Sequence, residues 1–278
     1  MRSAAHTLIT VAPTGAEVAK ADVPQLPTTT EELVETAVRC EAAGASLIHL
    51  HIRDAEHRPT LDAGRLREAV DAVRGATDLV VQLSTGGSVH DPLEQRLTVL
   101  DAEPDSCSLT CGTTNFGDDV FLNPWPFVVE LYRQSIAHEV VPEFELFDLG
   151  HVASLRRLLD TEGLPYGGKV HVDLVTGVPG GMPGTAQAVA AAVSMLPEQV
   201  TSWSATGIGR THLPVLAAAL AGGGHLRVGM EDNLVFAKGR PVRHNEELVA
   251  RAAEVATTLQ RPPMSTSDAR ELLGVKRR

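Results

Sequence analysis

The stretch Ser46-Leu-Ile-His-Leu-His-Ile-Arg53 has the composition of a short buried strand, yet it carries two histidines. In a strand, residues two apart point to the same side, with Cβ atoms roughly 6–7 Å apart. The imidazoles of His49 and His51 can therefore converge on one metal ion. Burying two polar rings among Leu and Ile is costly unless each ring is bonded to something. The pair is compatible with a metal site and with two satisfied core histidines.

Working outward from this stretch, short apolar segments alternate with amphipathic ones along the whole chain. We expect eight strand–helix units in series, which in 278 residues predict a single-domain (β/α)₈ TIM barrel over 1–278. An open doubly wound sheet is the alternative, but no GxGxxG motif follows the first strand. The predicted strands are 7–14, 46–53, 79–84, 106–111, 141–147, 169–176, 201–205 and 226–230. The predicted helices are 30–43, 62–75, 91–102, 123–137, 152–159, 185–196, 213–221 and 246–259.

Composition narrows the class of partner. The formal charge of −11 argues against nucleic acid, which needs a basic surface. No apolar run approaches the roughly 18 residues that span a bilayer, so we expect no membrane segment. Cys40, Cys107 and Cys111 form no CxxC motif, and a strand holds the last two too far apart for a disulfide. This usage fits a reducing compartment, and we expect a cytoplasmic protein.

In (β/α)₈ barrels the chemistry lies at the C-terminal ends of the strands, and polar residues gather there in this chain. Glu231 ends the eighth predicted strand, from which it could reach the two histidines. Two imidazoles and a carboxylate with open positions form a catalytic zinc arrangement, which cobalt, manganese and iron also accept. The alternative is that Glu231 and Asp232 are a solvated loop pair.

Other polar features are less specific. His90, His212 and His225 lie near element ends, where we expect surface or capping residues. The glycine-rich loop 177–184 could approach a phosphate with its backbone N–H groups. A flexible lid or a simple turn explains that loop equally well.

Several motifs, taken together, resemble the β-keto acid cleavage enzymes, in particular those of the 3-keto-5-aminohexanoate cleavage type. They run in order over nearly the whole chain, and their combination is specific although each alone is not. The motifs are Thr14-Gly-Ala-Glu17, Ile48-His-Leu-His-Ile-Arg53, Leu83-Ser-Thr-Gly-Gly87, Asn115-Phe-Gly-Asp-Asp119, Val141-Pro-Glu143 with Glu145, Gly177-Val-Pro-Gly-Gly-Met182, Gly207-Ile-Gly-Arg210, and Arg227 with Glu231-Asp-Asn233.

The resemblance implies a zinc-bearing barrel, usually a homotetramer, that converts a β-keto acid and acetyl-CoA into acetoacetate and an acyl-CoA. By matching position, His49, His51 and Glu231 would hold Zn²⁺. Asp232 would be the base, kept ionised by Arg227 and with Ser84 nearby.

The resemblance also implies substrate contacts. Glu17 and Glu145 would face the far end of the substrate, and Ser108 keeps a hydroxyl that the family uses. Thr110 stands where the family member compared has Asn, so an amide contact is lost there. A carboxylate at Glu17, in a site that accepts an anion, predicts an amino or ammonium group on the substrate. The alternative is that Glu17 pairs with Lys20 or Arg53.

Two further functions remain compatible with these residues. A metal-dependent aldolase or lyase would form the same enolate without CoA, and its turnover would be independent of a thioester. A non-catalytic zinc or acyl-ligand binding protein would need the histidines for stability and would turn over no substrate.

Overall fold

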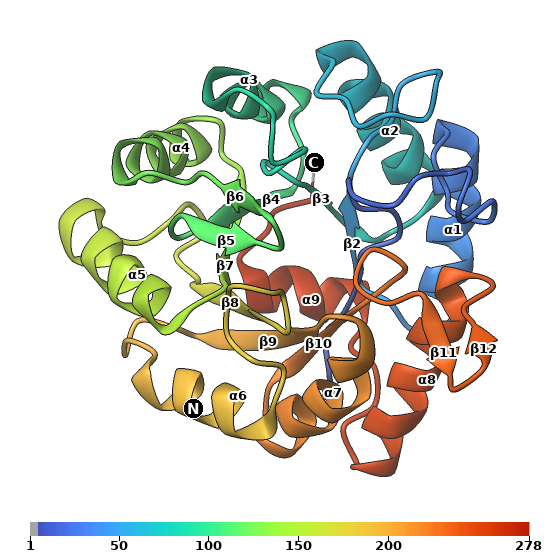
Figure 1. Cartoon of the computed structure of the whole chain (residues 1–278). Helices are drawn as coiled ribbons and strands as arrows, with labels where there is room; N and C mark the ends of the chain where they lie inside the picture. The colour runs from blue at the N-terminus through green and yellow to red at the C-terminus, as the bar shows by residue number, and fades with distance from the viewer. Residues whose placement is uncertain (1–4, 278) are drawn as a thin grey trace.

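The computed structural model describes residues 5–277 and shows a closed barrel of eight parallel strands with helices outside it (Figure 1). The barrel strands are β1 (Ile9–Val11), β2 (Leu47–Leu50), β3 (Val80–Leu83), β4 (Ser106–Thr110), β7 (Val141–Leu146), β8 (His171–Thr176), β9 (Ser202–Gly207) and β10 (His225–Val228). The ring closes because β1 pairs with both β2 and β10. The predicted (β/α)₈ barrel is confirmed, and the open sheet is excluded.

The outer layer consists of the helices that follow the strands. They are α1 (Thr30–Ala42), α2 (Ala63–Ala76), α3 (Leu93–Leu97), α4 (Trp125–Ala137), α5 (Leu149–Glu162), α6 (Ala186–Met195), α7 (His212–Ala221) and α8 (Asn245–Thr258). The helix predicted over 91–102 is divided into α3 and a 3₁₀ helix over Thr98–Ala102. Among the described residues, no helix is long and apolar enough to cross a bilayer.

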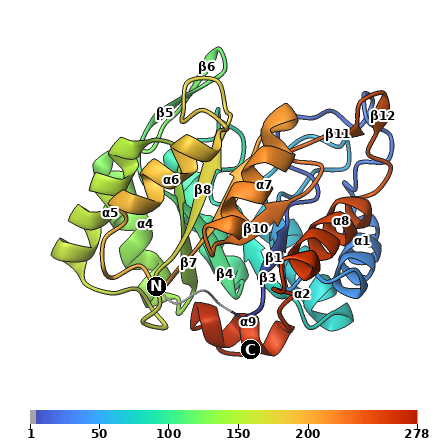
Figure 2. The same cartoon turned by 90° about the horizontal axis from the view of Figure 1, so that it is seen from below.

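Two hairpins and a C-terminal helix of the described chain were not predicted. Two hairpins, β5 (Thr114–Phe116) with β6 (Asp119–Phe121) and β11 (Val235–Ala237) with β12 (Arg240–Pro241), follow barrel strands β4 and β10. A last helix, α9 (Thr266–Leu273), follows α8. Figure 2 shows both hairpins at one end of the barrel and α9 at the other. The hairpins therefore belong to the end that carries the polar strand termini.

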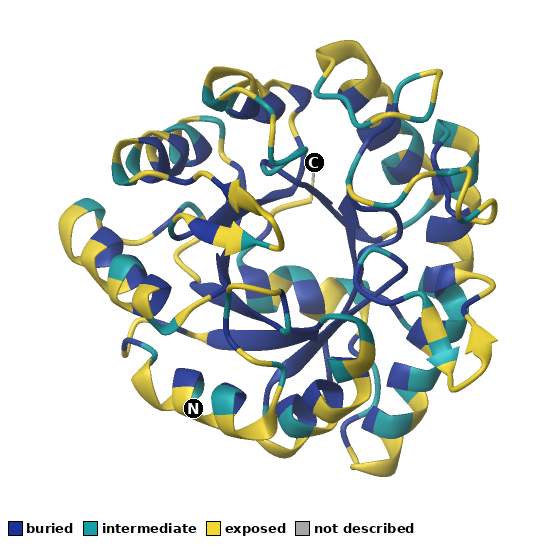
Figure 3. Cartoon of the chain, viewed as in Figure 1, coloured by how far each residue is buried: buried dark blue, intermediate teal, exposed yellow. Residues whose placement is uncertain are grey.

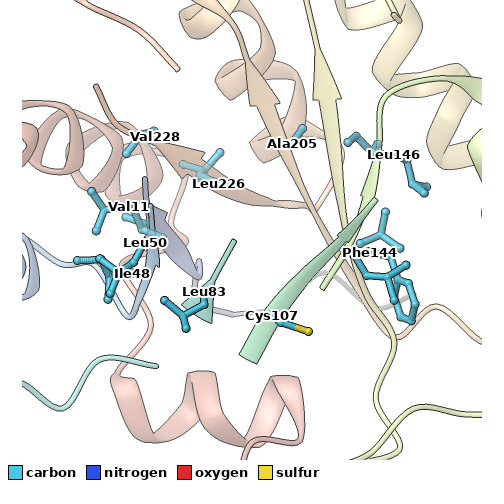
Figure 4. Packing of buried hydrophobic residues seen from close by; sticks show 14 of the residues in the cluster. Val11, Ile48, Leu50, Leu83, Cys107, Phe144, Leu146, Ala205, Leu226 and Val228 are labelled. Carbon is cyan, nitrogen blue, oxygen red and sulfur yellow. The ribbon is translucent and has the colours of Figure 1, made fainter. Parts of the chain in front are cut away.

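Side chains alternate between the two faces of the barrel wall. The outward-facing residues are apolar and pack against the helices, and Figure 4 shows part of this layer: Val11, Ile48, Leu50, Leu83, Cys107, Phe144, Leu146, Ala205, Leu226 and Val228. Figure 3 shows the strands buried and the outer helix faces exposed. The described cysteines are free and buried. The outer layer thus supplies the main hydrophobic core.

On β2, β3 and β7 the inward-facing residues change from apolar to polar along the strand. Leu47 and Val80, near the strand starts, belong to a separate apolar cluster with Ala269 and Leu273 of α9. Two residues further on, on the same face, stand His49 and Gln82. On these three strands the interior is therefore apolar at the end near α9 and polar toward the other end.

Candidate active site and metal centre

His49, His51 and Glu231 converge at the C-terminal end of the barrel, as the sequence predicted. One ligand atom from each lies within 4.8 Å of the other two. The Nε2 atoms of His49 and His51 lie 3.9 and 3.6 Å from Glu231 Oε1. Although β2 and β10 are far apart in the sequence, each pairs with β1, which brings their ends together.

These residues fit a divalent transition metal. Glu231 Oε2 is buried and has no hydrogen-bond partner, so it needs a ligand to satisfy it. Burial lowers the pKa of His49 to about 3 and also lowers that of His51, which keeps both imidazoles neutral, as metal binding requires. Burial raises the pKa of Glu231, but the opposing effect of Arg227 and the two histidines is larger. The pKa is therefore lowered to about 2, and the carboxylate is ionised.

Gln82 belongs to the candidate metal site, although it was not predicted from the sequence. Strand β3 pairs with β2 so that His49 lies beside Gln82, and His49 Nδ1 is 2.5 Å from Gln82 Oε1. Because an amide oxygen only accepts, Nδ1 carries the proton and Nε2 is left with its lone pair toward Glu231. Gln82 in turn donates to Ser106 Oγ at 3.1 Å. Gln82 therefore fixes the tautomer and the ring orientation of His49.

Glycines allow the close approaches that the ligand loops require. Gly229 has φ +156°, and a Cβ there would lie 1.9 Å from the carbonyl oxygen of Ala12. Gly15 has φ +65°, and a Cβ there would lie 2.7 Å from Cγ of Glu231. Larger residues at either place would displace the loops that position Glu231.

Arg227 is the centre of the charge network beside these ligands. Its guanidinium donates to both oxygens of Asp232, at 3.1 and 3.0 Å, and to Glu145 Oε1 at 3.0 Å. It also bonds Glu231 Oε1. Arg227 is only 5% exposed, so these interactions operate with little solvent screening.

Burial dominates the protonation of the two further acids. Burial raises the pKa of Asp232 to about 7, and the opposing effect of Arg227 does not restore the ordinary value. Burial likewise raises the pKa of Glu145 to about 7 against the influence of Arg227. From the sequence we expected Arg227 to keep Asp232 ionised. In the structure, burial favours the protonated carboxyl and outweighs the effect of Arg227 on the pKa. A carboxylate with a pKa near 7 is matched to proton transfer at neutral pH.

A pocket of about 370 Å³ opens over these residues. One side is polar and contains eight of the ten predicted site residues: Glu17, His49, His51, Ser84, Glu145, Arg227, Glu231 and Asp232. The other side is apolar. There Phe116, Phe121 and Phe147 contact one another edge to face at 6.2–6.4 Å between ring centres. Val178 and Pro179 of the glycine-rich loop lie beside them.

Ser108 and Thr110 do not line this pocket. Thr110 Oγ1 donates to Glu145 Oε2 at 3.0 Å, and Ser108 Oγ accepts from the N–H of Thr85 at 3.3 Å. With Arg227 on its other oxygen, Glu145 has both oxygens occupied by the protein. Ser108 and Thr110 therefore position other residues of the site from beneath it.

Glu17 lies at the exposed rim, and the pairings considered for it do not form. Lys20 instead pairs with Glu32 at 2.6 Å. The Arg53 guanidinium donates to the carbonyl oxygens of Gly15, His57 and Val18. Within residues 5–277, the carboxylate of Glu17 forms no direct hydrogen bond or salt bridge. It lines the pocket and interacts with the Arg53 guanidinium only through its charge.

We expected His212 and His225 to be surface or capping residues. His212 is the C-cap of the 3₁₀ helix Gly209–Thr211, but neither histidine lies at the surface. Both are buried, with 3% and 2% exposure. His225 Nδ1 accepts a hydrogen bond from the N–H of Leu8, which joins β10 to the residue just before β1. His212 begins α7, and its Nε2 is buried without a hydrogen-bond partner. His90 is exposed, as expected.

Known proteins similar to this chain share its whole length. A 3-keto-5-aminohexanoate cleavage enzyme of Acetoanaerobium sticklandii is 37% identical over 97% of this chain and 98% of its own. A 3-dehydrocarnitine:acetyl-CoA trimethylamine transferase of Rhizobium meliloti is 33% identical over 98% of both chains. A 3-oxoadipate:acetyl-CoA acetyltransferase of Cupriavidus necator is 32% identical over 96% of this chain and 94% of its own.

A solved structure, the binary complex of ObcA with oxaloacetate, has the same fold. It aligns with a TM-score of 0.77 and 21% identity over 91% of this chain and 68% of that one. A family model described as beta-keto acid cleavage enzyme matches residues 6–275. The chain therefore belongs to the β-keto acid cleavage enzyme family.

Proposed function

We propose that this enzyme converts a β-keto acid and acetyl-CoA into acetoacetate and an acyl-CoA. The observation that carries the proposal is the position of the Arg227–Asp232 pair. The Asp232 carboxylate, whose pKa burial raises to about 7, lies beside the three candidate metal ligands in one pocket. An electrophile and a base side by side are what removal of a proton next to a carbonyl requires.

His49, His51 and Glu231 would hold the metal, and the proposed ion is zinc, one of several that this ligand set accepts. When bound, the ion would supply a Lewis acid for the oxygens of the β-keto acid. Asp232 takes the proton from C2, the carbon between the two carbonyl groups. Arg227 holds both oxygens of Asp232, which fixes the direction in which the carboxylate accepts that proton.

The proposed steps balance. The C2 carbanion attacks the carbonyl carbon of acetyl-CoA, forms a C–C bond and releases the CoA thiolate. The thiolate attacks the keto carbon C3 of the original acid, and the C2–C3 bond breaks. The acyl group leaves as acyl-CoA, and Asp232 returns its proton to the acetoacetate carbanion. The apolar wall with Phe116, Phe121 and Phe147 limits water, which would otherwise hydrolyse the thioester.

The remaining predicted residues have supporting roles in the proposal. Ser84 lies in the pocket wall, where its Oγ accepts from the N–H of Gly86 at 3.1 Å and can still donate to a substrate oxygen. Glu145 holds Arg227, and Thr110 holds Glu145. Ser108 supports the loop after β3 through Thr85.

The substrate of the proposed reaction carries an amino or ammonium group at the end away from the carboxylate. What supports this is that the Glu17 carboxylate, at the exposed pocket rim, forms no direct salt bridge or hydrogen bond within the described residues. A cation there would pair with it, whereas a second anion would be repelled. The homotetramer, the cytoplasmic location and the single-domain organisation over 1–278 stay predictions.

The test is an acetoacetate assay with aminated and neutral β-keto acids of equal length, each with and without acetyl-CoA. We expect acetoacetate and acyl-CoA in equal amounts, only when the thioester is present, and faster with the aminated acid. Turnover that ignores the thioester would point to an aldolase or lyase and would overturn the proposal. In Glu17→Gln, the preference for the aminated acid should fall, while the rate with the neutral acid should not.

A further inference from the structure

A second groove, of about 640 Å³, lies beside the pocket and shares part of its wall with it. The two have Val18, Ile208, Glu231 and Asp232 in common. The groove runs between the 3₁₀ helix Gly209–Thr211 with the start of α7 on one side and the β11–β12 hairpin on the other. A ligand in it would reach the reacting atoms at Asp232 from outside the pocket.

Two cationic side chains that line the groove have no acidic partner in the described residues. Arg210 and Lys238 line it, and no salt bridge joins either of them to an acid within the described residues. Its two acidic wall residues, Glu231 and Asp232, are already bound by Arg227. The chain has a formal charge of −11. Two cationic side chains without an acidic partner in the described residues therefore concentrate positive charge at this groove.

Buried atoms in the same groove also lack partners. His212, 3% exposed, has an Nε2 without a hydrogen bond. The Nε and Nη2 of Arg251 are buried and unbonded, while its Nη1 donates to the carbonyl oxygen of Phe236 at 2.5 Å. The Phe236 ring lies 4.2 Å from the Arg251 guanidinium carbon and holds it in place. Unbonded donors that are already positioned and desolvated are suited to an anion.

The position of the groove in the fold also favours the binding of an anion. Strands β9 and β10 are the seventh and eighth of the barrel in chain order, and the groove lies at the loops that follow them. In (β/α)₈ barrels these loops and a short extra helix often bind phosphate. The N-terminus of α7, which enters the groove at His212, adds a favourable dipole.

We infer that this groove binds the phosphorylated nucleotide end of CoA, with Arg210, Lys238 and Arg251 on its phosphates. The acyl arm would then cross between Val18 and Ile208 into the pocket and bring the thioester to Asp232. This inference rests on the proposed function for its ligand, and it adds the residues that recognise CoA.

The test combines shortened substrates with charge-removing variants. Acetyl-pantetheine has the same thioester as acetyl-CoA but no phosphates. We expect Arg210→Ala and Lys238→Ala each to raise the KM for acetyl-CoA about tenfold, the size of one lost charged hydrogen bond. The KM for acetyl-pantetheine, the KM for the keto acid and kcat should not change. Lys169→Ala, which removes an exposed charge at the start of β8, at the opposite end of the barrel, is the matched control.

A binding measurement separates this inference from the proposed reaction. Adenosine 3′,5′-bisphosphate should bind the wild-type enzyme in calorimetry about tenfold more tightly than the Arg210→Ala or Lys238→Ala variant, whether or not any keto acid turns over. If wild type makes no acetoacetate with either thioester, the proposed function fails while this binding stands or falls by itself. Equal losses with both thioesters, no loss with acetyl-CoA, or inorganic phosphate competing as well as the bisphosphate would overturn the assignment.

Discussion

Strands β2 and β3 carry opposite chemistry at their two ends inside the barrel. Beneath, Leu47 and Val80 pack with Leu273 of α9 and close the barrel with apolar contacts. At the other end, His49, Gln82 and Arg227 occupy the same inward face and leave a pocket open. On these strands, two residues separate the side chains that stabilise the fold from those of the candidate active site. Substitutions at the two ends should therefore have separable effects.

The largest effect is expected at the metal ligands. His49→Ala should remove the bound metal and lower kcat/KM at least about a thousandfold, because several kcal/mol of charge stabilisation are lost. Metal analysis of the purified protein beside the rate assay checks this. A variant that keeps both its metal and its rate would remove His49 from the site.

Asp232→Asn should lower kcat by about 10²–10⁴-fold, the usual contribution of a positioned base. Metal content should stay at the wild-type level, because Asp232 is not among the three converging ligands. Steady-state rates and metal analysis on one preparation give both readouts. Loss of metal together with rate would assign Asp232 to the metal shell instead.

Leu273→Ala tests the closed end. It removes a side chain that is 3% exposed and packs in the α9 cluster, so the free energy of unfolding should fall by about 2–4 kcal/mol. Urea unfolding measures this, and kcat should be unchanged at a temperature where the variant is folded. A fall in kcat without a loss of stability would show that the two ends are coupled.

Gln82→Met keeps the volume of the side chain but removes the acceptor for His49 Nδ1–H. Metal affinity should fall by about 10–100-fold, as for other outer-shell partners of a metal histidine. Competition with a chelator measures the affinity. Ser106→Ala removes only the partner beyond Gln82 and should cost less.

Glu143→Gln should act on stability, and its effect depends on pH. Burial, with Asp173 and Glu145 nearby, raises the pKa of Glu143 to about 8, and its Oε2 lies 3.5 Å from Nε2 of His171. Since the unfolded pKa is near 4.5, the folded state binds the extra proton between about pH 4.5 and 8, and wild-type stability falls as pH rises through that window. The variant lacks this loss, so its stability relative to wild type should increase from pH 5 to pH 8. A difference that does not vary with pH would contradict the assignment.

The fold could be predicted because each strand–helix unit carries its own pattern. Eight strands were predicted within a few residues of their observed bounds, for example 106–111 for Ser106–Thr110. Helix α9 was missed although Ser265 caps it and Gly274 ends it with φ +73°, both of which are readable signals. The β5–β6 hairpin was missed although Gly117, with φ +66°, lies between its strands.

The three candidate metal ligands could be predicted because residue type, spacing and strand end all agreed. The partner of His49 could not, because Gln82 is found only from the register between β2 and β3. Burial of His212 depends on how α7 packs, which sequence spacing alone does not reveal. Thr110 is one strand residue among several until its bond to Glu145 is seen.

The most direct test of the central claim is an anomalous diffraction map from crystals grown with zinc. The account predicts one peak about 2.0–2.2 Å from Nε2 of His49, Nε2 of His51 and a carboxylate oxygen of Glu231. Zinc bound elsewhere, or these three side chains turned away from one another in the crystal, would contradict it.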